Sequence, residues 1–261
     1  MPHRIGNALR PALPQTRPSL DPALSQTEPD TAMATPRPAP DRCRIVLVLP
    51  ADLDPGAAPA AVAGALEGGD VASLVVPPHA LGERAYSDHL KALAAIAQPR
   101  GVAVLAVRDA RLAGRLGLDG VHLDGDDDEL ADVIDRAGDR LMVGSESART
   151  RDRALEIGAF EPDYLMFGRV GGDTHDEPHA KNLELAAWWA SMVEIPAIVM
   201  AGADLDGTVP CAETGAEFVG LSRAVFEDPA RAREMVSRAN AMLDQNGPRF
   251  ARLTGANGSF A

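Results

Sequence analysis

Residues 102–123 read VAVLAVRDARLAGRLGLDGVHL, and this stretch contains the unit from which the chain is built. An apolar run over 102–106 predicts a strand, residues 109–116 predict a helix, and residues 119–123 predict the next strand. The strand runs are mostly continuous in apolar residues rather than alternating, which is typical of strands buried on both faces of a parallel sheet. The predicted repeat is therefore a strand followed by a covering helix.

The same unit occurs eight times along the chain. Strands are predicted at 44–49, 71–76, 102–106, 119–123, 141–144, 163–167, 196–200 and 217–221. Helices are predicted at 58–67, 84–97, 109–116, 127–137, 148–157, 182–193, 205–214 and 223–243. Eight consecutive strand–helix units predict a closed (βα)8 TIM barrel, and the alternative is an open doubly wound sheet.

Both ends of the chain differ in composition from this region. Nine prolines interrupt residues 1–41, and no apolar period of 2 or 3.6 runs between them. Such a segment buries too little surface to offset its chain entropy, which predicts a disordered N-terminal extension. Residues 42–245 form the predicted barrel domain, and the turn-forming residues of 246–261 predict a flexible tail.

Charge and cysteine content narrow the choice of partners. The 261 residues carry 25 Lys+Arg against 38 Asp+Glu, a formal net charge of −13, which argues against binding to nucleic acid or to anionic membranes. No apolar run approaches the length of a membrane span. Two widely separated cysteines, Cys43 and Cys211, suit a reduced cytoplasm better than a disulfide framework. Small molecules are the expected partners, and self-association is left open.

In a barrel of this kind the active site is formed by the loops that follow the strands. After the fourth predicted strand, Asp124 and Asp127 belong to a run of five carboxylates that opens a helix. Acidic side chains at this position cap the free N–H groups of a helix, and they also suit Mg²⁺, which takes one or two carboxylates together with substrate phosphate. Both interpretations stay open, and Asp124 and Asp127 are the candidate metal ligands.

The last two strands are followed by short turns suited to phosphate. Gly220, Ser222 and Arg223 lead directly into the last predicted helix, and Gly202 lies in the turn after the seventh strand. Glycine allows close backbone approach, while N–H groups, a hydroxyl and a guanidinium donate to anions. We expect these four residues to form a phosphate site. Residues 168–179 make the longest loop and are expected to act as a lid.

Several motifs in their order along the chain resemble a known family. They are Asp119-Gly120-Val121-His122-Leu123, then Gly144-Ser145, then Asp163-Tyr164-Leu165-Met166-Phe167-Gly168-Arg169-Val170, then Ala201-Gly202, then Gly215-Ala216-Glu217-Phe218-Val219-Gly220. The order is similar to that of the thiamine phosphate synthase family, including its thiazole tautomerase-like branch, over nearly all of residues 44–243.

The resemblance implies a TIM barrel with a transferase activity in thiamine biosynthesis. Such an enzyme joins an aminopyrimidine methyl diphosphate to a thiazole phosphate, with Mg²⁺ bound and release of pyrophosphate. It also implies that Asp127 binds the metal and that Ser145 is the catalytic serine at the pyrophosphate. Gly202 and Ser222 are implied to form the thiazole phosphate pocket.

The chain departs from the family pattern at three places. The Gln-x-Arg-x-Lys strip of strand two falls on Ser73–Pro77, and the Asn-Asp pair after strand three falls on Val107 and Arg108. The Thr-x-Thr-Lys element retains Thr174, with Lys181 displaced. We expect Arg108, Arg169 and Arg223 to rebuild diphosphate binding. The alternative is a catalytically impaired barrel that binds a thiazole phosphate or another small phosphate in a regulatory or accessory role.

Overall fold

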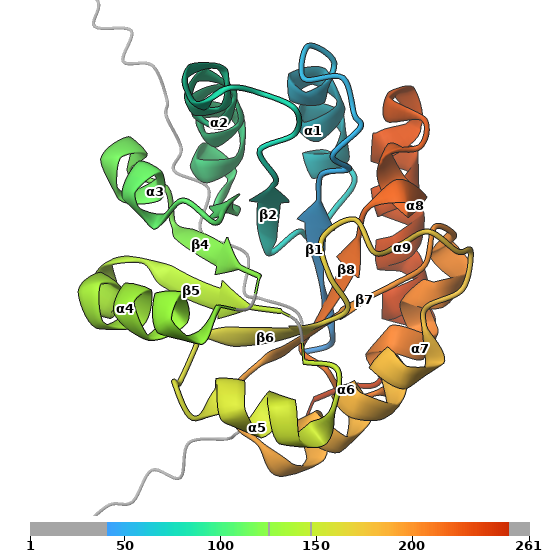
Figure 1. Ribbon diagram of the computed structural model, residues 1–261. Coiled ribbons are helices and arrows are strands. Elements are labelled where there is room, and N and C mark those ends of the chain that lie inside the picture. The colour runs from blue at the N-terminus through green and yellow to red at the C-terminus, as the bar shows by residue number, and fades with distance from the viewer. Residues whose placement is uncertain (1–40, 125, 147, 251–261) are drawn as a thin grey trace, which may run out of the picture. The chain divides into compact units, whose positions relative to one another are not determined.

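The architecture is a closed barrel of eight parallel strands. A computed structural model describes residues 41–124, 126–146 and 148–250. Each strand pairs with the next, and the last pairs with the first (Figure 1). The predicted TIM barrel is confirmed, and the open doubly wound sheet is excluded. The strands are β1 (Arg44–Val48), β2 (Ser73–Val76), β3 (Ala103–Val107), β4 (Gly120–Leu123), β5 (Met142–Ser145), β6 (Tyr164–Phe167), β7 (Ala197–Met200) and β8 (Phe218–Leu221).

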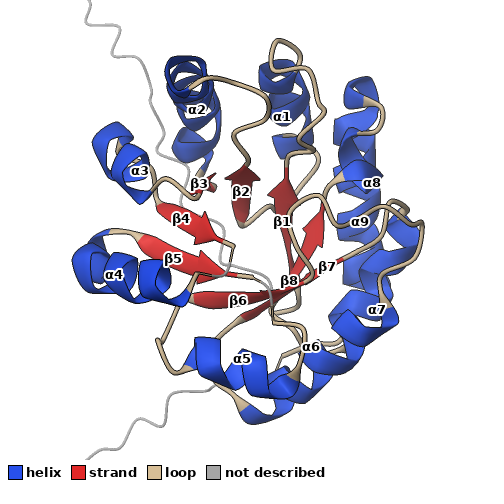
Figure 2. Ribbon diagram, in the orientation of Figure 1, coloured by secondary structure: helices blue, strands red, loops and turns tan. Residues whose placement is uncertain are grey.

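Helices surround the barrel on its outer side (Figure 2). They are α1 (Ala58–Leu66), α2 (Glu83–Ala97), α3 (Ala110–Leu116), α4 (Asp127–Ala137), α5 (Arg151–Gly158), α6 (Ala180–Met192), α7 (Thr208–Glu213), α8 (Arg223–Phe226) and α9 (Ala232–Asn246). One continuous helix was predicted over 223–243, and this prediction is wrong because α8 and α9 are separate. The helix breaks at Pro229, where Asp228 caps a short 3-10 turn, because proline has no N–H to continue the ladder. None of these helices in the described ranges is long and apolar enough to cross a membrane.

Two apolar clusters fill the barrel, one on each side of the strands. The outer cluster lies between strands and helices and includes the fully buried Trp189. The inner cluster occupies the barrel interior and consists of Val46, Val48, Val75, Leu105, Val107, Tyr164, Met166, Ile198 and Met200. Both cysteines are buried and free, and burial raises the pKa of each thiol to about 12.

The register between β4 and β5 decides which side chains enter the interior. His122 lies opposite Gly144, and Leu123 lies opposite Ser145. Leu123 belongs to the outer cluster, whereas His122 is fully buried next to Tyr164 inside the barrel. Because side chains alternate along a strand, Ser145 faces the surrounding helices and the next residue, Glu146, faces the interior.

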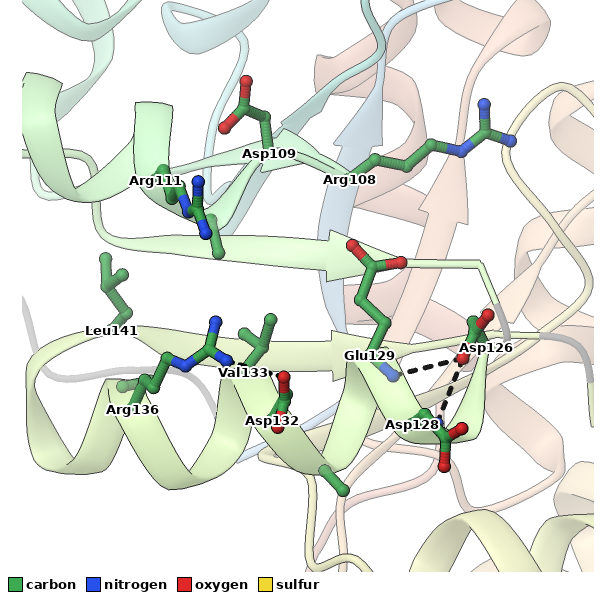
Figure 3. A pocket seen from close by; sticks show the side chains of 13 residues that line it. Arg108, Asp109, Arg111, Asp126, Asp128, Glu129, Asp132, Val133, Arg136 and Leu141 are labelled. Carbon is green, nitrogen blue, oxygen red and sulfur yellow. Dashed lines mark hydrogen bonds and ion pairs between the residues drawn. The ribbon is translucent and has the colours of Figure 1, made fainter.

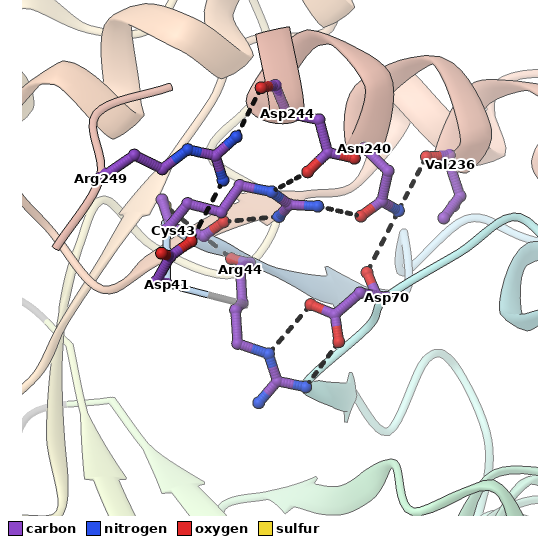
Figure 4. A network of polar contacts seen from close by, with 9 residues as sticks. Asp41, Cys43, Arg44, Asp70, Val236, Asn240, Asp244 and Arg249 are labelled. Atoms are coloured by element: carbon purple, nitrogen blue, oxygen red, sulfur yellow. Dashed lines mark hydrogen bonds and ion pairs between the residues drawn. The ribbon is translucent and has the colours of Figure 1, made fainter. Parts of the chain in front are cut away.

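A polar network closes the end of the barrel at which the strands begin (Figure 4). The guanidinium of Arg42 donates to Asp244 Oδ1 at 2.7 Å, to the Cys43 carbonyl at 2.8 Å and to Asn240 Oδ1 at 2.9 Å. Asn240 in turn donates to the Asp70 carbonyl, so the network joins β1, the approach to β2 and α9.

The two ends of the described region meet next to this network. The Phe250 N–H donates to the Asp41 carbonyl at 2.7 Å, and Arg42 forms an antiparallel bridge with Arg249. The start of the predicted flexible tail is thus hydrogen-bonded up to residue 250. Residues 1–40 of the predicted disordered extension and residues 251–261 of the tail lie outside the described residues.

Candidate functional site

A basic cavity of about 480 Å³ opens where β6 and β7 end. The loop from Gly168 to His179 and the start of α6 form most of its wall, with Met200 and Ala201 at its floor. Its basic side chains come from three segments and are Arg149, Arg169 and Lys181. Thr174 also lines it, so the structure brings together two predicted site residues and the displaced Lys181.

The cations of this cavity are available to a ligand. Arg149, Arg169 and Lys181 are exposed, and their side chains form no ion pair with the described residues. Most other arginines of the barrel face a carboxylate, as Arg44 faces Asp70 at 2.8 Å. Unpaired guanidinium and ammonium groups around a cavity suit the oxygens of a phosphate or diphosphate. Two carboxylates, Asp173 and Glu177, also line the cavity, but Asp173 accepts from a backbone N–H, and the three cations outnumber the acids. On a chain of net charge −13, this local excess of positive charge marks the cavity as a candidate anion site.

The turn after β8 lies under the same loop. Asp173, which is only 3% exposed, accepts a hydrogen bond from the Arg223 backbone N–H at 2.6 Å. Ser222 is buried, and its hydroxyl has no hydrogen-bond partner among the described residues. The Arg223 guanidinium pairs with Asp52 at 2.7 Å. The Asp173 carboxylate therefore accepts the hydrogen bond of a main-chain N–H that was predicted to bind phosphate.

The turn after β7 is covered by the loop in the same way. A Cβ atom at Gly202 would lie 2.0 Å from the Asp176 carbonyl oxygen, so only glycine fits this approach. The Ala203 N–H donates to the His175 carbonyl at 2.8 Å. Gly220 faces the barrel interior, where Met200 packs against it. The loop thus contacts the turns after both β7 and β8.

The acidic run after β4 is engaged by caps and arginines. Asp126 accepts from the N–H groups of Asp128 and Glu129, which caps α4. Asp124 pairs with Arg108, and Asp127 pairs with Arg153 of α5 at 2.8 Å. These hydrogen bonds to arginine lower the pKa of both carboxyl groups below the ordinary value.

This arrangement does not fit a preassembled Mg²⁺ site. Each of the two predicted ligands, Asp124 and Asp127, already faces a guanidinium, so the pair offers a cation little net negative charge. Within the described ranges, no group of three or more His, Cys, Asp or Glu side chains is placed to hold a metal. The structure also shows why Arg108 cannot serve as an unpaired cation, since Asp124 accepts from it.

A buried polar network inside the barrel mouth was not anticipated as a site. His122 Nδ1 lies 2.8 Å from the Tyr164 hydroxyl, and His122 Nε2 lies 3.1 Å from Glu146 Oε2. Glu146 Oε2 also accepts from the Val170 N–H of the loop at 2.7 Å. Ser145, the predicted catalytic serine, is fully buried on the outer side of β5, with its hydroxyl 3.4 Å from the Glu146 carbonyl. Its role stays a prediction, but the side chain that enters the mouth is Glu146.

A larger cavity of about 800 Å³ lies on the flank of the barrel between α3 and α4 (Figure 3). Its lining carries both signs of charge and includes the ion pair of Arg136 with Asp132 at 2.6 Å. It borders no inner-cluster side chain, and most of its wall is the exposed side of α4. Reactions on barrels of this type occur at the strand ends, so the smaller basic cavity is the better candidate.

The barrel mouth thus presents a basic cavity, two glycine-containing turns and a loop that covers both turns. These features define the class of (βα)8 barrels whose strand-end loops form a small-molecule site.

Comparison with known proteins identifies the family within this class. The family profile of thiamine monophosphate synthase matches residues 45–225, so the chain belongs to this family. A thiamine-phosphate synthase of Hyphomonas neptunium is 30% identical over 217 residues, which cover 81% of this chain and 97% of that protein. The corresponding enzyme of Rhodospirillum centenum is 28% identical over 202 residues, covering 77% and 98%.

A solved structure has the same fold. The thiamine phosphate pyrophosphorylase of Pyrococcus furiosus superposes with a TM-score of 0.66 at 19% identity, covering 78% of this chain and 97% of that one. At this identity the likeness concerns the fold alone. The resemblance to the thiamine phosphate synthase family predicted from sequence motifs is confirmed.

Proposed function

We propose that this chain is a thiamine-phosphate synthase, a transferase that joins an aminopyrimidine methyl diphosphate to a thiazole phosphate and releases pyrophosphate. Family membership over residues 45–225 supports this proposal, and the observation that carries it is the basic cavity at the barrel mouth. The curated relatives bear the same activity in their names, which disfavours the alternative of a non-catalytic phosphate-binding barrel.

In the proposed reaction the diphosphate lies in the basic cavity. Arg149, Arg169 and Lys181 neutralise the charge that accumulates on the leaving pyrophosphate, which lowers the barrier to breaking the carbon–oxygen bond. The family's strand-two cations are replaced here by Ser73–Pro77, so this set supplies charge from the loops after β5 and β6 and from the start of α6 instead. The carboxylates after β4 face arginines, and the three cations of the cavity carry the proposed neutralisation of the diphosphate.

The thiazole phosphate is proposed to bind at Gly202, Gly220, Ser222 and Arg223. The Arg223 N–H donates to the Asp173 carboxylate, which has the same sign of charge as the phosphate and repels it. The phosphate must therefore displace this carboxylate to bind. The unpartnered Ser222 hydroxyl becomes available to the phosphate oxygens once the loop moves.

Arg169→Ala is expected to raise the KM for the aminopyrimidine diphosphate roughly tenfold, because a charge-assisted contact to the diphosphate is lost. Pyrophosphate release in the presence of both substrates, followed by a coupled assay, measures this change. Arg111→Ala removes an exposed arginine of α3 and is the matched control. Absence of pyrophosphate release by the unmodified protein contradicts the proposed function, and an unchanged KM in Arg169→Ala contradicts the placement of the diphosphate.

Asp173→Ala is expected to tighten binding of the thiazole phosphate by about tenfold, since the competing internal carboxylate is gone. Isothermal titration calorimetry with the thiazole phosphate measures the dissociation constant. Asp176→Ala removes the same charge from the same loop, but its side chain accepts no hydrogen bond from Arg223. Equal effects of the two substitutions mean that general charge, and not the Arg223 contact, sets the affinity.

A further inference from the structure

Glu146 is a buried carboxylate of which only one oxygen is hydrogen-bonded to the described residues. Its side chain is 8% exposed, and Oε2 takes both hydrogen bonds, from His122 Nε2 at 3.1 Å and from the Val170 N–H at 2.7 Å. Oε1 accepts no hydrogen bond from the described residues. It is also not one of the solvent-inaccessible side-chain atoms that lack a partner. Burying a charged carboxylate costs free energy when one of its oxygens has no hydrogen-bond partner. A ligand that donates a hydrogen bond to this oxygen offsets the cost.

The neighbours of Glu146 fix its orientation. Burial raises the pKa of the Tyr164 phenol far above its ordinary value, so the hydroxyl stays protonated and donates to His122 Nδ1 at 2.8 Å. With Nδ1 as acceptor, the neutral imidazole carries its proton on Nε2 and donates it to Glu146. Tyr164 and His122 therefore act as positioning residues that hold Oε2 and leave Oε1 for a ligand.

The basic cavity lies next to this carboxylate. Val170 belongs to the loop that forms the cavity wall, and Gly168 and Arg169, which immediately precede it, line the cavity. Met200, at the cavity floor, belongs to the same inner cluster as Tyr164. Glu146 itself is not among the residues that line the cavity, but its hydrogen bond to Val170 joins it to the loop that forms the cavity wall. A substrate bound with its diphosphate among Arg149 and Arg169 can extend its ring toward this carboxylate.

We propose that Glu146 Oε1 accepts a hydrogen bond from the amino group of the aminopyrimidine and makes Glu146 a specificity-determining residue of the transfer reaction. This inference rests on the proposed function for the identity of the ring. Carboxylates are strong acceptors for amino N–H groups, and the buried setting strengthens the bond. A pyrimidine without the amino group leaves this oxygen unpaired, which gives the site a basis for rejecting it.

The same contact favours the transition state. The bond between the methylene carbon and the diphosphate oxygen breaks, and its electron pair leaves with pyrophosphate. The positive charge that remains spreads over the ring and its amino nitrogen until the thiazole nitrogen supplies a lone pair to form the new carbon–nitrogen bond. Glu146 neither donates nor accepts a proton in this step. Its hydrogen bond strengthens as the amino group becomes more positive.

The decisive experiment compares two small probes by isothermal titration calorimetry. One is the aminopyrimidine methanol, which lacks the diphosphate, and the other is the same molecule without the amino group. The unmodified protein is expected to bind the amino compound at least about tenfold more tightly. Glu146→Gln is expected to bring this ratio close to one and to lower kcat for pyrophosphate release about 100-fold. Glu213→Gln, an exposed substitution at the end of α7, keeps both values.

Tyr164→Phe tests the positioning role separately, because it removes the hydroxyl and retains the ring. The preference for the amino probe is expected to fall to an intermediate value. We also expect kcat to change by a larger factor than KM. Equal binding of the two probes to the unmodified protein overturns the proposal without any variant, and so does a full preference retained in Glu146→Gln. If the protein prefers the amino probe but releases no pyrophosphate, the proposed reaction is wrong and the role of Glu146 in binding stands.

Discussion

Gly144→Ala is expected to destabilise the barrel by about 3–5 kcal/mol. A Cβ atom at this position would lie on the Tyr164 ring, whose Cε1 would be 2.2 Å away. The ring is buried among the inner-cluster side chains and has no space to retreat, so overpacking adds to the loss of its hydrogen bond to His122. The free energy of unfolding in urea, measured by circular dichroism, checks the value.

Two further substitutions make this prediction specific. Gly64→Ala in α1 meets no atom within 4 Å and is expected to leave stability unchanged or raise it by up to about 1 kcal/mol. Combining Gly144→Ala with Tyr164→Leu is expected to cost less than the sum of the two single substitutions, because the smaller side chain removes the clash. A loss below about 1 kcal/mol for Gly144→Ala alone contradicts the packing described here.

Arg42→Met is expected to lower the free energy of unfolding by about 3 kcal/mol. The guanidinium is buried and donates to Asp244, Asn240 and the Cys43 carbonyl, so its removal leaves the last two acceptors without this donor. Arg44→Met breaks a more exposed, bidentate pair with Asp70 and is expected to cost no more than about 1 kcal/mol. Urea unfolding of both variants measures the difference, and equal losses rule out a special role for the buried network.

The barrel could be predicted because its signal is local and repeated. Each strand–helix unit, such as residues 102–123, carries its own apolar pattern, and eight of them leave little choice of architecture. The one long helix expected over 223–243 shows the limit of periodicity. Its apolar spacing continues past Pro229, but the missing N–H group of that proline ends the hydrogen-bond ladder.

The site was harder to predict because its contacts join distant residues and depend on strand register. Strand five was expected to end at Gly144, whereas it continues to Ser145. Since side chains alternate along the strand, Ser145 lies on the outer side and Glu146 on the inner side. Asp173 and Arg223 are 50 residues apart, so no local pattern indicates that one accepts from the other. The charge pairs of Asp124 and Asp127 likewise come from packing between neighbouring units.

The loop over 168–179 also makes the two proposed phosphate sites energetically dependent on each other. Asp173 lines the basic cavity and at the same time holds the Arg223 N–H beneath it. A thiazole phosphate that displaces this carboxylate changes the charge around the diphosphate, and a diphosphate that draws the loop toward itself frees the turn after β8. By linkage, each substrate must then alter the affinity for the other by the same factor, so the order of binding changes the path but not the final affinity of the pair.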